Sequence, residues 1–147
     1  MNFEVDTREY VTALKEMVEQ GMEVSMTIFG TSMEPFLIDK RDKIYFRKPE
    51  GKIKNGDMVF YRRESGAYVM HRIMRVKKHQ YYLAGDHQTF LEGPIEAAQI
   101  FAKVVAVERA GVWLTEKDRL WKFYAGWWRR LFRVRKVGNK LKRIIGK

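Results

Sequence analysis

The chain begins with a helical pattern of hydrophobic and polar positions and then changes to a strand pattern. Apolar residues recur every three or four positions between residues 6 and 20, which predicts a short amphipathic helix. From Glu23 the period is two, and β-branched and aromatic residues dominate, as is typical of strands. The predicted strands are 24–29, 43–47, 58–63, 68–76, 80–83, 100–108 and 112–115. Turn-forming residues separate them, so we expect a mainly β fold, a small curled antiparallel sheet or barrel.

The last thirty residues return to a helical pattern and hold nearly all of the positive charge. The net charge of the chain is +11, and residues 118–147 contain 11 Lys and Arg against 1 acidic residue. We therefore expect three parts: an N-terminal amphipathic helix (1–22), a β domain (23–117) and a basic, aromatic, amphipathic tail (118–147). Such a charge block is typical of an interaction segment.

The tail combines aromatic rings with arginines, a composition typical of a helix that lies in a membrane interface. Basic residues near an anionic bilayer each contribute about 1 kcal/mol to binding. We therefore expect the tail to dock on an anionic membrane surface. Two alternatives remain open. The same charge and aromatic stacking could bind nucleic acid, although a single apolar stripe on the helix favours lipid. The helix could instead pack on the β domain with one solvated face.

Three short motifs, in the order serine, histidine, acid, point to nucleophilic chemistry. The sequence GTSMEP at 30–35 places Ser32 directly after a predicted strand. A serine hydroxyl is a poor nucleophile and needs a base and donors for the oxyanion. His71 could be that base, because strand alternation places it among apolar neighbours and burial favours the neutral imidazole. Asp86 or Glu92 could orient the imidazole.

Each of these residues also has an ordinary structural explanation. A lone histidine on a strand is most often a core residue bonded to the backbone, and Asp86 could be a turn aspartate after Gly85. Lys77 or Lys78 could serve as the base instead, but both lie in a charged segment that we expect to be solvated. Backbone N–H groups near Ser32 are the expected oxyanion donors, with the hydroxyl of the preceding threonine as a weaker candidate.

The three ordered motifs resemble those of the S24/S26 serine peptidases, the superfamily of type I signal peptidases and self-cleaving repressor domains, over roughly residues 24–107. The resemblance implies a mainly β peptidase fold with Ser32 as nucleophile. It implies that His71 is the base, as in the endoplasmic-reticulum-type branch. Most of the family has lysine at this position. The acid matches Asp86 and, less well, Glu92, so we place Asp86 slightly ahead. Gly30 stands where many signal peptidases have a hydroxyl donor.

Composition narrows the chemistry further. The chain has no cysteine, and its three histidines show no helical ligand spacing, so we expect neither a metal nor a cofactor. The first residues lack the basic and apolar regions of a signal peptide, and no stretch of about 18 apolar residues occurs. We therefore expect a cytoplasmic protein that is peripheral to a membrane.

Together these observations predict a serine endopeptidase of signal peptidase-like type that cleaves a precursor or leader peptide at a membrane surface. The alternative is a catalytically inactive module of the same fold that binds a peptide, a membrane or nucleic acid.

Overall fold

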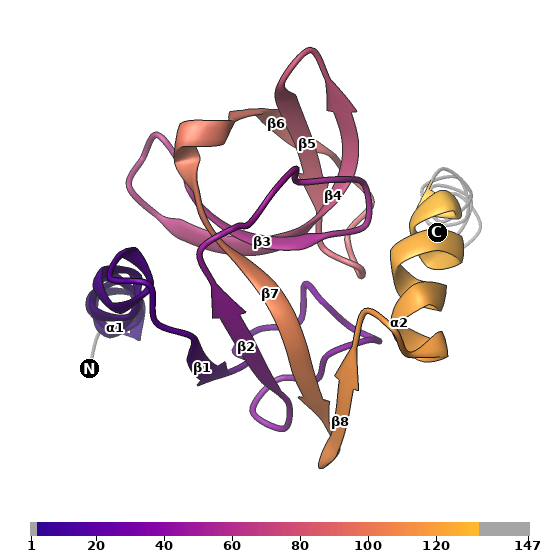
Figure 1. Ribbon diagram of the computed structural model, residues 1–147, viewed down its shortest axis with the longest axis horizontal. Helices are drawn as coiled ribbons and strands as arrows, with labels where there is room; N and C mark the ends of the chain where they lie inside the picture. The colour runs from indigo at the N-terminus through magenta and orange to yellow at the C-terminus, as the bar shows by residue number, and fades with distance from the viewer. Residues whose placement is uncertain (1–2, 133–147) are drawn as a thin grey trace, which may run out of the picture.

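The computed structural model describes residues 3–132 and confirms the mainly β fold (Figure 1). Eight strands form one antiparallel sheet, and helices flank it on both sides. The strands are β1 (Val24–Thr27), β2 (Lys43–Arg47), β3 (Met58–Arg62), β4 (Tyr68–Lys77), β5 (Gln80–Ala84), β6 (Glu92–Glu96), β7 (Ile100–Arg109) and β8 (Val112–Thr115). The helical elements are α1 (Phe3–Glu19), the 3₁₀ turn η1 (Ala97–Gln99), α2 (Arg119–Phe123) and the π-helical stretch η2 (Tyr124–Trp128).

The long strand β7 holds the two halves of the sheet together. The strand order is β1-β2-β7-β3-β4-β5-β6, and β8 also pairs with β7. Figure 1 shows β3 to β6 on one side of β7, and β1, β2 and β8 around its other end. Register shifts in the pairings of β7 with β2 and β3 bend the strand, because a bulge increases local twist. The sheet therefore curls into two lobes with separate interiors.

Alternating residues of the central strands fill two different hydrophobic cores. Met58 and Phe60 of β3 point into the first core, which also receives the residues after β1. Val59 and Tyr61 point into the second core, which lies among β3, β4, β5 and β6. The near-continuous burial of β3 follows from this arrangement, since a strand covered on both faces buries every residue.

Two helical segments pack against the first core from opposite sides (Figure 1). The N-terminal helix α1 contributes Val11, Leu14 and Val18, which confirms the predicted amphipathic helix. At the other end, Trp121 and Tyr124 are buried, with ring centroids 6.0 and 4.8 Å from that of Phe36. The first part of the predicted tail thus packs on the β domain. The rest of that tail, residues 133–147, lies outside the described residues.

One strand was absent from the sequence prediction. β6 pairs with β5 and contains Gly93 and Pro94, two residue types that are unfavourable inside a strand. It tolerates both residues because it lies at the edge of the sheet, where one side of the strand needs no ladder hydrogen bonds. The strand carries Glu92 at its first position.

Within residues 3–132, no helix is long and apolar enough to cross a bilayer.

Candidate active site

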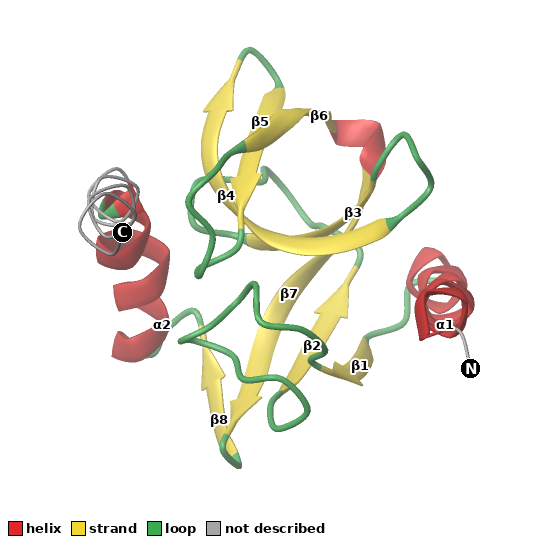
Figure 2. Cartoon of the chain, turned by 180° about the vertical axis from the view of Figure 1, so that it is seen from behind, coloured by secondary structure: helices red, strands yellow, loops and turns green. Residues whose placement is uncertain are grey.

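The loop between β1 and β2 carries Ser32, and buried apolar residues of the same loop anchor it to the first core. Figure 2 shows this loop on the near side of the sheet. Met33, Phe36 and Leu37 insert into the first core and are almost fully buried. Gly30 adopts a φ of 90°, and its N–H donates to Asp39 Oδ1 at 2.7 Å. Glycine reaches this left-handed conformation at little steric cost, so the chain can turn sharply before the serine.

The third motif packs its backbone directly against the serine. The N–H of His87 donates to the Ser32 carbonyl oxygen at 2.9 Å. A Cβ atom built on Gly85 would lie 2.2 Å from that same oxygen and 2.9 Å from the Ser32 Cβ. No side chain fits at residue 85 without moving the loop. The glycine of this motif therefore permits the contact between two segments more than fifty residues apart.

His71 lies in the middle of β4 and faces the second core. Its side chain is buried, with 4% of its surface exposed, and shares this core with Val69 and Ile73, as alternation predicts. Burial, and to a smaller extent the nearby Arg63 guanidinium, lower the pKa of His71 to about 4. The imidazole is therefore neutral above about pH 4, and a neutral imidazole is what a general base requires.

A buried tyrosine connects His71 to Glu92. The Tyr61 hydroxyl lies 3.2 Å from His71 Nδ1 and donates a hydrogen bond to Glu92 Oε2. Arg63 donates to Glu92 Oε1, and burial raises the pKa of that carboxyl group. Sequence reasoning missed Tyr61. Its signal was available in the alternation of β3, where Val59 and Tyr61 occupy one face, but nothing in the sequence pairs that face with His71.

Asp86 makes a different connection. Its two carboxylate oxygens accept hydrogen bonds from Arg72 Nε at 2.7 Å and Nη2 at 2.9 Å, and both side chains are buried. The third guanidinium nitrogen of Arg72, Nη1, donates to the Gly56 carbonyl oxygen at 2.8 Å. The Trp128 indole donates to the Asp86 carbonyl oxygen at 2.8 Å. Asp86 therefore anchors the third motif to β4 and to the C-terminal helix, on the opposite face of β4 from His71.

A cavity of about 190 Å³ opens beside Ser32. Its lining combines α1, β1, the serine loop, β2, β3 and β4: Val11, Met26, Ile28, Phe29, Gly30, Ser32, Met33, Ile44, Phe60, Tyr68, Val69 and Met70. Most of these side chains are apolar, which is typical of a site that binds an apolar group next to a few polar atoms. The cavity therefore suits an apolar group placed next to Ser32.

The structure also places the predicted oxyanion donors near Ser32 and the two lysines considered as alternative bases. Among the described residues, the amides of Ser32 and Met33 take part in no backbone hydrogen bond. Thr31 is exposed. Lys77 and Lys78 are exposed at the tip of the β4–β5 hairpin, and Lys77 is roughly 20 Å along the strand from His71 at about 3.3 Å per residue.

Within residues 3–132, no three His, Asp or Glu side chains gather in a way that could hold a metal ion.

Comparison with known families gives a match to one family model. The family model described as Peptidase S24-like matches residues 2–105, which contain all three motifs. The chain belongs to the Peptidase S24-like family. This confirms the resemblance to the S24/S26 superfamily. No curated protein matches the chain.

In this Peptidase S24-like domain the match covers α1 and the sheet up to the first half of β7. The match thus includes Ser32, His71, Asp86 and Glu92, and ends before β8 and the C-terminal helix. The helix that packs on the third motif is an addition to the matched region.

Proposed function

We propose that the chain is a serine endopeptidase of signal peptidase-like type that cleaves a precursor or leader peptide. Ser32 attacks the scissile carbonyl carbon, and His71 accepts the serine proton and then returns it to the leaving amine. Asp86 or Glu92 supplies the carboxylate, and the amides of Ser32 and Met33 stabilise the oxyanion. An acyl-enzyme forms and water hydrolyses it, with no cofactor.

The observation that carries this proposal is the chain of contacts that joins the three motifs. Ser32 is in backbone contact with Gly85 and His87. Ala84, next to Gly85, pairs with Arg72 on β4, and Arg72 is the neighbour of His71. Among the described residues no hydrogen bond joins the Ser32 hydroxyl to His71; such bonds often form only when substrate is bound. The apolar cavity beside Ser32 supports a peptide bound as an extended strand.

The proposal includes an anionic membrane surface as the place of cleavage. Phe123, Trp127 and Leu131 recur every fourth residue and are exposed, whereas Trp121 and Tyr124 are buried against the β domain. Large exposed rings next to basic side chains such as Lys122 and Arg130 are typical of interfacial helices. A helix held by one face thus offers its other face to a lipid surface.

The test is mass-spectrometric analysis of a diverse peptide library incubated with the purified chain, with and without anionic vesicles. We expect wild type and Ser25→Ala to give the same products and Ser32→Ala to give none. Ser25 is a matched control because it is exposed on the neighbouring strand β1. Cleavage that persists in Ser32→Ala would contradict the proposal. No cleavage by any of the three folded proteins would favour the inactive binding module.

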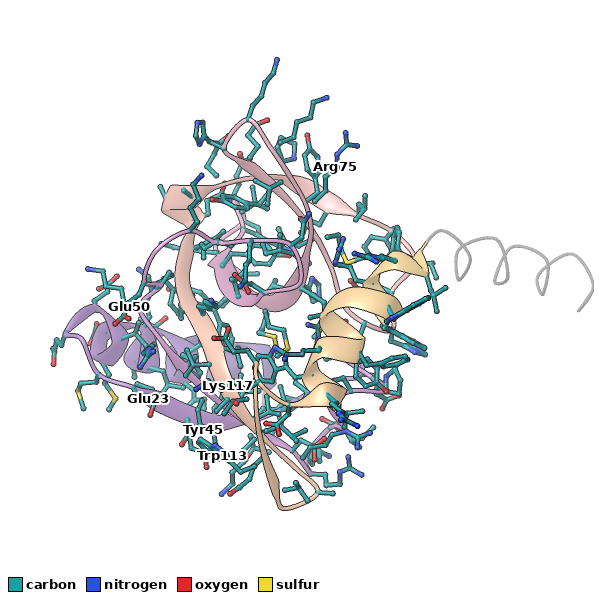
Figure 3. All side chains as sticks on the ribbon, turned by 45° about the vertical axis from the view of Figure 1, so that its right-hand side comes forward. Glu23, Tyr45, Glu50, Arg75, Trp113 and Lys117 are labelled. Carbon is teal, nitrogen blue, oxygen red and sulfur yellow. The ribbon has the colours of Figure 1, made fainter. Side chains whose placement is uncertain are left out.

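The vesicle arm tests the membrane surface separately. Wild type should float with anionic vesicles, and Trp127→Ala should float less. Trp113→Ala should behave as wild type. Trp113 is an exposed ring too, but it lies on β8 and packs on Tyr45 of β2, away from this helix (Figure 3). Equal flotation of both tryptophan variants, or preferential binding to nucleic acid, would contradict a lipid role for this helix face.

A further inference from the structure

The hydroxyl of Tyr61 lies between two groups that are candidates for the same catalytic unit. Tyr61 on β3 is fully buried and faces the second core beside His71 of β4. Glu92 reaches the same hydroxyl from the first position of β6. Strand pairing places Tyr61 opposite Val69, so it is the diagonal neighbour of His71 on one face of the sheet. Three strands thus converge on one buried oxygen.

The number of hydrogens available fixes the direction of these bonds. A carboxylate can only accept, so the single Tyr61 hydrogen is donated to Glu92. The Tyr61 oxygen can then only accept from His71, which requires a hydrogen on Nδ1. A neutral imidazole carries a hydrogen on only one of its two nitrogens, and Nε2 is therefore left with its lone pair. This is the tautomer in which Nε2 can take a proton from a serine.

We propose that Tyr61 is a positioning residue, through which Glu92 fixes the orientation and tautomer of His71 so that Nε2 is the nitrogen that accepts the Ser32 proton. The inference rests on the proposed peptidase function. It also assigns the orienting carboxylate to Glu92, because both Asp86 oxygens are bound by Arg72 on the opposite face of β4.

What Glu92 passes to His71 is orientation more than charge. Arg63 pairs with Glu92 and compensates its charge close to the imidazole. The same guanidinium disfavours a proton on the imidazole, so the ring stays neutral until the reaction begins. In the acylation step the Ser32 oxygen bonds to the scissile carbon while its proton moves to Nε2. Throughout this step the N–H at Nδ1 of His71 remains hydrogen-bonded to the Tyr61 oxygen. The proton on Nε2 then moves to the leaving nitrogen as the peptide bond breaks.

The chain offers a matched control for a change at Tyr61. Tyr81 on β5 packs against the same second core, and its ring is half-buried. Tyr61→Phe and Tyr81→Phe each remove one hydroxyl group from this core, but only the first removes a partner of His71. A second variant, Glu92→Gln, keeps every ring in place. Its amide can either accept from or donate to the Tyr61 hydroxyl, so it no longer dictates the tautomer.

The experiment is nitrogen NMR of the full chain with ¹⁵N-labelled histidine, with His71 assigned by the signal lost in His71→Gln. Wild type and Tyr81→Phe should show hydrogen on Nδ1 and a bare Nε2. Tyr61→Phe and Glu92→Gln should show a mixture of tautomers. On a peptide substrate, kcat should fall about 10- to 100-fold in both, with KM unchanged, because part of the general-base contribution is lost.

The NMR and kinetic readouts separate the failure of this inference from the failure of the proposed function. Hydrogen on Nε2 in wild type, or an unchanged tautomer and kcat in Tyr61→Phe, would overturn the role of Tyr61 even if Ser32→Ala abolishes cleavage. If Tyr61→Phe does not fold, Glu92→Gln decides by the same spectrum. If no variant cleaves any peptide, the peptidase function fails, and the spectrum still decides whether Tyr61 and Glu92 set the tautomer of His71.

Discussion

Two adjacent residues of β4 lead to two arginine–carboxylate pairs in opposite environments. Arg72 itself pairs with Asp86, and the side-chain exposures are 0% and 2%. His71 leads through Tyr61 to the pair of Arg63 and Glu92, with exposures of 40% and 24%. One pair is sealed between the first core and the C-terminal helix, whereas the other reaches solvent at the edge of the sheet.

The difference supports the proposed assignment of the orienting role to Glu92. A buried bidentate pair has both charges compensated, and separating it leaves an isolated charge in the interior. Such a pair fixes the backbone, and Arg72 donates to both Asp86 carboxylate oxygens on the face of β4 opposite His71. A half-exposed pair is weaker, and Glu92 Oε2 accepts hydrogen bonds from both the Tyr61 hydroxyl and Arg63 Nη2. Environment therefore distinguishes two acids that look alike in sequence.

The largest expected effect comes from breaking the sealed pair. Asp86→Asn should lower the free energy of unfolding by about 3–5 kcal/mol, because the Arg72 guanidinium loses its counter-charge while buried. Urea unfolding followed by circular dichroism measures this. The double variant Arg72→Met with Asp86→Leu should regain most of the loss, since apolar groups of similar size can replace a buried pair. A loss below about 1 kcal/mol in Asp86→Asn would show that the pair is not sealed in solution.

The next effect is a pH dependence set by His71. The pKa of His71 is about 4 in the folded protein and 6.5 for an ordinary histidine, so between these pH values the unfolded chain binds a proton that the folded protein does not. The free energy of unfolding should therefore fall as the pH drops from 6.5 to 4, by up to about 3.5 kcal/mol at about 1.4 kcal/mol per pKa unit. The groups facing the imidazole are Tyr61, Glu92 and Arg63.

Urea midpoints at several pH values measure this dependence. His71→Gln should lose this part of the pH dependence, whereas His79→Gln, in the exposed β4–β5 turn, should keep it. Parallel curves for wild type and His71→Gln would mean that His71 titrates normally in the folded protein and is not buried as described.

The smallest expected effect on stability comes from the half-exposed pair. Glu92→Gln should lower the free energy of unfolding by less than about 1 kcal/mol, because a partly solvated ion pair contributes little. Thermal unfolding of Glu92→Gln beside Glu96→Gln, an exposed position on the same strand β6, measures it. A loss as large as that of Asp86→Asn would remove the distinction between the two pairs.

Most of the fold follows from local patterns in the sequence. The alternation in β2, the β-branched and aromatic residues of β3, β4 and β7, and the amphipathic spacing of α1 predict these elements, and each of them contributes buried residues. The exception is β6. Its Gly93 and Pro94 match a turn pattern, and only its position at the sheet edge, which no local pattern contains, makes it a strand.

The candidate site was predictable only in part, for a related reason. Ser32 and His71 stand out by residue type and by their place in short motifs, and both remain predictions until activity is measured. The link from His71 to Glu92 depends on a residue ten positions away along the chain and on strand pairing across three elements. The preference for Asp86 over Glu92 rested on a motif, which does not report that Arg72 occupies the carboxylate.

The contact between Gly85 and Ser32 has a consequence for motion. It joins two main chains, with a hydrogen bond between backbone atoms and no side chain in between. Rotamer changes, which let side-chain contacts loosen on the picosecond to nanosecond scale, do not occur there. The serine loop between β1 and β2 and the third motif are thus expected to fluctuate as one body, so that a displacement of either segment carries Ser32 with it.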